Sequence, residues 1–128
     1  DAAYKDIINT QIQSEKNTIL IYPVPYVIWD PPSRYAALKF RYGNFVDDMK
    51  IDYNLFVERN KYTYQIFDSI QSSPNLKRIH PAYYLCKESD NKCNVTKNNI
   101  LFFKDHTHLS SDGAKLLVPG IIKSLKYN

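Results

Sequence analysis

The sequence predicts an α/β fold, in which helices alternate with short buried strands. Residues 3–14 carry apolar side chains at the spacing of a helix. After a short break, residues 18–23 form a continuous apolar run that is rich in β-branched residues and ends at a proline. Such a run is typical of a strand buried on both faces, as in a parallel sheet that helices cover. A helix, a short break and a buried strand are the basic repeat of α/β proteins.

The next segment is expected to be a stiff loop, because it contains Pro23, Pro25, Pro31 and Pro32. Loops at the carboxyl ends of strands line the binding crevice of an open α/β sheet. The residues of this loop that we take as candidates for substrate binding are Tyr26, Trp29 and Asp30. The alternative is an aromatic loop that packs as a lid over the core.

Four further elements follow along the chain. Residues 53–72 have a helical pattern, residues 76–80 form a weak strand candidate closed by a proline, and residues 100–103 form a better one. The last helix is expected to start at Ser110 or Ser111, since serine is a good N-cap. Its apolar stripe runs to residue 125, and Pro119 should kink or interrupt it.

Composition excludes several classes of protein. Three glycines in 128 residues are too few for a P-loop or a dinucleotide-binding fingerprint. The net charge is +4, but the basic residues are scattered among acids, so nucleic acid is not an expected partner. No apolar stretch approaches the length that crosses a bilayer.

The stretch that carries chemistry is the expected strand–turn–helix around Asp105 and His108. In a turn, the Cα atoms of residues three apart can lie within about 7 Å. The Asp105 carboxylate can then accept the Nδ1–H of His108, which leaves Nε2 free as a base and stabilises the imidazolium. This spacing predicts the acid–base half of a Ser-His-Asp site.

Two other interpretations compete for the same residues. In the first, Asp105 only caps the next helix and His108 is satisfied locally. In the second, Asp105, His106 and His108 hold a metal ion, although His80 is the only other histidine that could complete the ligand set. We expect no metal and predict that His106 points away from the crevice.

A series of motifs around this stretch resembles one known family. The motifs, in order, are Tyr22-Pro23-Val24-Pro25, Ile79-His80-Pro81, Leu85-Cys86, Cys93, Phe102-Phe103 and Asp105-His106-Thr107-His108-Leu109-Ser110. Together they resemble the extracytoplasmic SGNH-fold domain of bacterial acyltransferase-3-type polysaccharide O-acetyltransferases. The similarity extends from about residue 18 to the C-terminus.

The resemblance implies a three-layer α/β/α fold and transfer of an acetyl group to a sugar hydroxyl through an acyl-serine. Asp105 would orient His108, which would act as general base and acid, without a cofactor. The acceptor would be a surface glycan such as lipopolysaccharide, and the membrane part of a parent protein would deliver the acetyl donor. The domain would lie on the periplasmic or extracellular face of a bacterium, with its parent anchored in the inner membrane. A carbohydrate acetyl esterase and a non-catalytic glycan-binding module are the alternatives.

The sequence departs from the family pattern in the nucleophile. The family's Gly-Asp-Ser is absent, and the only Asp-Ser pair, Asp68-Ser69, follows Phe67 within an expected helix. A nucleophile elbow needs a sharp strand-to-helix turn, so Ser69 is expected to be a surface or packing residue. The family's oxyanion glycine and asparagine cannot be placed either. We therefore expect residues 1–128 to be a partial SGNH-like domain that lacks its first third and is inactive alone.

Cys86 and Cys93 are the only cysteines, and a polar loop separates them. A local disulfide would suit an oxidising compartment, whereas two free thiols would suit the cytosol. The disulfide is favoured because the family resemblance points outside the cytoplasm.

Overall fold

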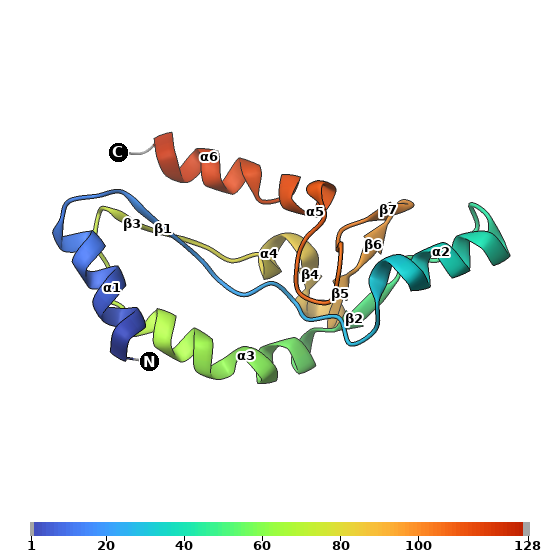
Figure 1. The fold of residues 1–128 in the computed structure, drawn as a ribbon, viewed down its shortest axis with the longest axis horizontal. Helices are drawn as coiled ribbons and strands as arrows, with labels where there is room; N and C mark the ends of the chain where they lie inside the picture. The colour runs from blue at the N-terminus through green and yellow to red at the C-terminus, as the bar shows by residue number, and fades with distance from the viewer. Residues whose placement is uncertain (1, 127–128) are drawn as a thin grey trace.

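A pair of parallel strands lies between helices in one half of the molecule (Figure 1). The structure is a computed structural model and describes residues 2–126. Strand β1 (Thr18–Ile21) pairs with β3 (Leu76–Ile79), with Thr18 opposite Leu76 and Ile21 opposite Ile79. Helices α1 (Ala2–Gln13) and α3 (Tyr53–Asp68) lie on one side of this pair, and α6 (Val118–Lys126) lies on the other (Figure 1). The α/β class predicted from the sequence is confirmed.

Two small antiparallel sheets follow the parallel pair. Strands β2 (Lys50–Asp52), β5 (Lys92–Asn94) and β4 (Cys86–Lys87) form one sheet in that order, and β6 (Thr96–Lys97) pairs with β7 (Ile100–Leu101). The short helix α4 (Ala82–Leu85) precedes β4, and the 3₁₀ turn η1 (Glu88–Asp90) connects β4 to β5. Cys86 and Cys93 face each other across these strands and form the predicted disulfide.

Helix α2 (Pro31–Tyr42) projects from the body of the molecule (Figure 1). The helix begins directly after an N-cap residue, since the Asp30 carboxylate accepts the backbone N–H of Ser33. Two prolines occupy its first turn, where proline is well tolerated. It ends at Gly43, whose φ of 61° favours glycine. The expectation of a stiff loop through Pro32 is therefore wrong after Asp30.

Two apolar clusters form the interior. One lies where α1 and α3 pack against the parallel pair, and its buried members are Leu20, Tyr22, Ile70 and Leu76. The other joins the antiparallel sheets to the segments around the Asp105 turn, and its buried members are Val27, Met49, Leu85, Val95, Phe102 and Phe103. The second cluster thus supports the residues that carry the predicted chemistry.

Several element boundaries differ from the sequence prediction. Strand β1 is not buried on both faces, since Ile21 is 48% exposed. Helix α3 ends at Asp68 instead of residue 72. Of the expected strand 100–103, only Ile100 and Leu101 pair with β6, and Phe103 makes an isolated bridge with Leu109.

The end of the chain follows the prediction closely. Ser110 caps α5 (Ser111–Lys115), because its hydroxyl accepts the N–H of Gly113. Pro119 lies in the first turn of α6, so the apolar stripe is divided between two helices, as expected. None of the described helices is long and apolar enough to cross a membrane.

Candidate functional site

The site is built on a short loop between Phe103 and Leu109. These two residues form an antiparallel bridge, and the N–H of Lys104 donates to the carbonyl of His108 at 3.0 Å. Phe103 is fully buried, so the start of the loop is anchored in the core. The N–H of Ser110 also donates to the carbonyl of Phe102, which fixes the start of α5 beside the loop. The loop is thus held at both ends by backbone hydrogen bonds.

The Asp105 carboxylate organises the turn. Its Oδ1 accepts the backbone N–H of Thr107 at 2.9 Å and that of His108 at 2.8 Å, as in an Asx turn. These hydrogen bonds lower the pKa of Asp105 from 3.8 to about 2, and the N–H of Thr107 has the largest effect. The side chain of His108 also lowers this pKa. The carboxylate is therefore ionised throughout the range in which a histidine can act as a base.

The same carboxylate binds the ring of His108. The Nδ1 atom lies 3.0 Å from Oδ1 and 2.9 Å from Oδ2 of Asp105, which is hydrogen-bond distance. An ionised carboxylate favours the Nδ1–H tautomer, which leaves a lone pair on Nε2. The side chain of His108 is 67% exposed, so Nε2 is accessible from outside. The pair can accept a proton at Nε2 and hold the resulting imidazolium beside a negative charge.

His106 binds the loop that follows β1 and makes no hydrogen bond with Asp105. Its Nδ1 lies 2.8 Å from the carbonyl oxygen of Val27, and its own carbonyl accepts the N–H of Val27. Its ring stacks on that of Tyr26, with centroids 5.9 Å apart. His106 therefore joins the Asp105 loop to the loop that follows β1. The sequence analysis did not identify Val27 as its partner, because no local spacing indicates a contact across 79 residues.

The three substrate-binding candidates lie on the loop that His106 contacts. Asp30 caps α2, and hydrogen bonds from Ser33 lower the pKa of its carboxyl group. Trp29 packs against the core and carries the guanidinium of Arg34 over its ring. Tyr26 is 41% exposed and carries Arg59 over its ring. Most of these contacts are packing contacts, and of the two aromatic rings that of Tyr26 is the more exposed.

A cavity of about 190 Å³ adjoins this loop. Tyr26, Ile28 and Trp29 form one wall, and residues of β2 and of the first turns of α3 form the other. This volume is smaller than the roughly 300–1,000 Å³ of pockets that enclose drug-sized ligands. It can take a group of the size of one small ring.

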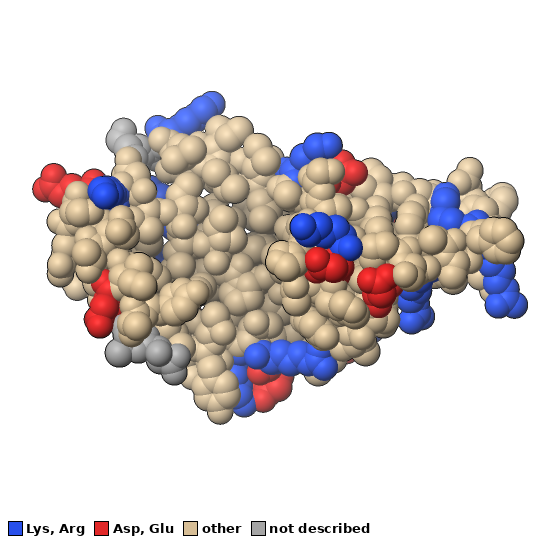
Figure 2. Space-filling model, in the orientation of Figure 1, with Lys and Arg blue, Asp and Glu red and all other residues tan. Residues whose placement is uncertain are grey.

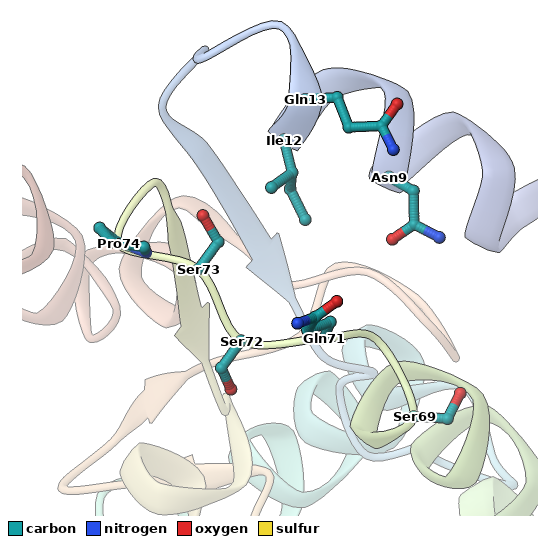
Figure 3. A pocket seen from close by; sticks show the side chains of 8 residues that line it. All are labelled: Asn9, Ile12, Gln13, Ser69, Gln71, Ser72, Ser73 and Pro74. Carbon is teal, nitrogen blue, oxygen red and sulfur yellow. The ribbon is translucent and has the colours of Figure 1, made fainter.

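A larger hollow, of about 480 Å³, lies elsewhere, between α1 and the segment that joins α3 to β3 (Figure 3). Ser69 lines it, together with other neutral residues (Asn9, Ile12, Gln13, Gln71, Ser72, Ser73 and Pro74). No acid or base among these residues could activate a nucleophile. The Ser69 hydroxyl donates to the carbonyl of Ile66 at the end of α3, which fits the expected structural role.

The described residues contain no group of three or more His, Cys, Asp or Glu side chains that could hold a metal ion. Within the Asp105 loop, the two imidazole rings have separate partners. His106 is bound to Val27 and His108 to Asp105. Asp105 therefore binds the ring of His108 and not that of His106.

Comparison with protein families identifies the family of the chain. Residues 1–123 match the family described as the SGNH domain fused to AT3 (acyltransferase-3) domains. Searches among curated proteins and among solved structures found no match.

Proposed function

Because the chain belongs to the family of SGNH domains fused to AT3 domains, we propose that it supplies the acid–base part of an active site that O-acetylates a cell-surface glycan. The observation that carries this proposal is the Asp105–His108 pair, with Nδ1 held 2.9 Å from the carboxylate and Nε2 accessible. In this arrangement a histidine can serve as general base and then as general acid.

The reaction would take place in two steps. A serine hydroxyl attacks the carbonyl carbon of the acetyl donor, Nε2 of His108 takes the hydroxyl proton, and the leaving group departs with that proton. A sugar hydroxyl then attacks the acetyl-serine, and Nε2 takes its proton and returns it to the serine oxygen. Asp105 keeps its negative charge throughout and stabilises the imidazolium in both steps.

We place the serine outside these 128 residues, since the sequence contains no Gly-Asp-Ser. The exposed surface around the parallel pair supports this. Among the described residues, β1 pairs only with β3, so its other edge is available to a further strand. Large apolar side chains of β1 and α6 are exposed, namely Ile21, Val118, Ile122 and Leu125. On the face drawn in Figure 2, a broad area to the left of the centre carries no charged side chain. Added strands would extend the pair into a three-layer α/β/α domain.

The partners and the compartment follow from the same proposal. The disulfide supports an oxidising compartment, so we assign the domain to the outer side of a bacterial inner membrane. The membrane part of the parent would deliver the acetyl donor, and the acceptor would be a polysaccharide or lipopolysaccharide. Tyr26, Trp29 and Asp30 would contact the acceptor, and the cavity beside Tyr26 would take one ring of it.

The test uses the full-length parent protein in cells that make the acceptor polysaccharide, with the O-acetyl content measured by NMR. We expect His108→Ala to abolish acetylation, and Asp105→Asn to lower it by about 10⁴-fold or less, because asparagine favours the wrong tautomer. The matched control is His106→Ala, which should retain most of the activity. Equal losses in the two histidine variants would contradict the assignment.

The reaction products distinguish the alternatives. With purified full-length protein, a transferase forms acetylated glycan, whereas an esterase releases acetate from a glycan that is already acetylated. If His108→Ala changes neither rate but the chain still binds the glycan, the domain is a binding module and the proposed catalytic role is wrong.

A further inference from the structure

Helix α2 and the turn after it form an arm that projects from the body of the molecule (Figure 1). We define the arm as residues 31–46. Its inner side is anchored, because Tyr35 and Leu38 pack against the core and the Tyr35 hydroxyl donates to the carbonyl of Asn99 at 2.6 Å. Its outer side and tip are therefore held in a fixed position away from the rest of the chain.

The tip of the arm exposes aromatic side chains to an unusual degree. Phe40 is 96% exposed and Phe45 is 94% exposed, whereas every other large apolar side chain among those exposed is at most 77% exposed. Tyr42 lies between them in sequence and is 49% exposed. Two fully exposed phenylalanines at one end of a molecule have an energetic cost in water and indicate an interaction surface.

The charge of the arm as far as residue 46 is of one sign, and the exposed Asp47 and Asp48 follow at its base, where Asp48 accepts the N–H of Asn98. Residues 31–46 contain Arg34, Lys39 and Arg41 and no acidic residue. On the face drawn in Figure 2, the outer part of the arm shows Lys and Arg side chains and no acidic ones. The guanidinium of Arg41 lies 5.4 Å from the centre of the Tyr42 ring, so cation and aromatic groups are side by side at the tip.

We propose that the tip of this arm, with Phe40, Tyr42, Phe45, Lys39 and Arg41, binds the surface of a bilayer that contains anionic phospholipids. Aromatic side chains enter the interface between headgroups and acyl chains, while Lys and Arg beside them contact the phosphate groups. Charge complementarity selects an anionic lipid surface over a neutral one. The inference does not depend on the proposed acetyl transfer, since no residue of the Asp105–His108 site takes part.

The test is co-sedimentation of the complete soluble part of the parent protein, which includes these 128 residues, with vesicles of phosphatidylcholine alone, or with about one third phosphatidylglycerol. We expect partition into the anionic vesicles to exceed that into the neutral ones by about tenfold or more, and to weaken with added salt. The variant F40A/F45A should partition about tenfold less, because it loses both apolar groups. Both side chains are over nine-tenths exposed, so the variant should fold, which circular dichroism verifies.

Matched controls distinguish binding by the arm from non-specific binding by other exposed aromatic or basic side chains. Tyr4→Ala combined with Tyr62→Ala removes two exposed aromatic rings from α1 and α3 and should leave partition unchanged. Arg41→Gln should weaken partition more than Lys16→Gln, which removes one exposed charge outside the arm. Equal partition of the wild type and F40A/F45A would overturn the proposal. So would self-association in the absence of vesicles that F40A/F45A abolishes, because the occupant would then be a second copy.

Discussion

At the scale of residues, the Asp105 carboxylate makes two kinds of hydrogen bond in its loop. It accepts two backbone N–H groups, which fixes the turn, and it binds Nδ1 of the histidine that the turn presents. The backbone hydrogen bonds make the carboxylate rigid and hold its pKa at about 2. A fixed, ionised carboxylate is what a general-base histidine needs as its partner.

The depressed pKa of Asp105 gives a direct prediction. Its carboxyl group should titrate with a midpoint of about 2, below the ordinary value of 3.8. Because the folded value is lower, Asp105 contributes stability above the ordinary pKa, and this contribution is lost as the pH falls from 3.8 to about 2. A carbon-13 NMR titration of the Asp105 carboxyl group measures the midpoint. A midpoint near 3.8 would mean that the Thr107 and His108 hydrogen bonds are not maintained in solution.

The Asp105–His108 contact could be predicted because it is local. A turn brings residues three apart together whatever the rest of the fold does. The partner of His106 could not be predicted in this way, since Val27 is distant in sequence. The capping role of Asp30 could have been predicted from the sequence, because Asp30-Pro31-Pro32 combines an N-cap residue with proline in the first helical turn. That signature predicts a capping role, which the structure shows.

At the scale of elements, the position of α5 against the strand before the loop depends on Gly113. A Cβ at this position would overlap the carbonyl group of Phe102, with its carbon atom only 2.9 Å away. The same Phe102 carbonyl accepts the N–H of Ser110, which caps α5. The close approach of helix and backbone therefore sets the distance between α5 and the end of the Asp105 loop.

We predict that Gly113→Ala destabilises the fold, by about 1–3 kcal/mol, because the overlap is with backbone atoms that cannot rotate away. The comparison is Gly120→Ala, where the added Cβ meets the hydroxyl end of the Tyr84 side chain. Because the Tyr84 side chain can move, Gly120→Ala should lower the free energy of unfolding by less than Gly113→Ala does. Urea unfolding of the two variants and the wild type measures both effects. An equal loss of stability in the two variants would show that the Phe102 contact is not the limiting one.

Element prediction succeeded where the apolar pattern was long, but it missed α2 although the cap of that helix is strong. Helix α1, helix α3 and the division of the last helix at Pro119 were predicted from these signals. The strands of the small antiparallel sheets are only two or three residues long, which is too short for an alternating pattern to emerge. These strands are instead held together by their pairing with neighbouring strands and, between β4 and β5, by the disulfide of Cys86 and Cys93.

At the scale of the whole molecule, a cluster of rings holds together the carboxyl ends of the two parallel strands. Tyr22 follows β1 and His80 follows β3, with ring centroids 3.9 Å apart. Tyr83 stacks on His80 at 4.8 Å, and the Tyr22 hydroxyl donates to Asp68 at the end of α3. Burial and the Asp68 carboxylate raise the pKa of Tyr22 to about 12, so this hydrogen bond persists throughout the ordinary pH range. The cluster thus connects β1, β3, α3 and α4.

The global stability of the chain should depend on the charge of His80. Partial burial lowers the pKa of His80 below its ordinary value of 6.5, and the nearby Asp68, which raises this pKa, and Arg78, which lowers it, leave the direction unchanged. Below pH 6.5 the unfolded chain therefore binds more protons at this residue than the folded chain does. His80 should accordingly reduce the free energy of unfolding as the pH falls from 6.5 toward the lower pKa of the folded state.

The variant His80→Phe isolates this effect, since a phenyl ring can occupy the stack between Tyr22 and Tyr83 but cannot take up a proton. We expect the wild type to lose more stability than His80→Phe between about pH 7.5 and about pH 5, with the free energy of unfolding measured in urea at each pH. His106 and His108 are present in both proteins, so their contributions cancel in the comparison. Parallel losses in the two proteins would mean that the folded chain admits the charged imidazolium without penalty. In that case the ring cluster would open around His80 in solution.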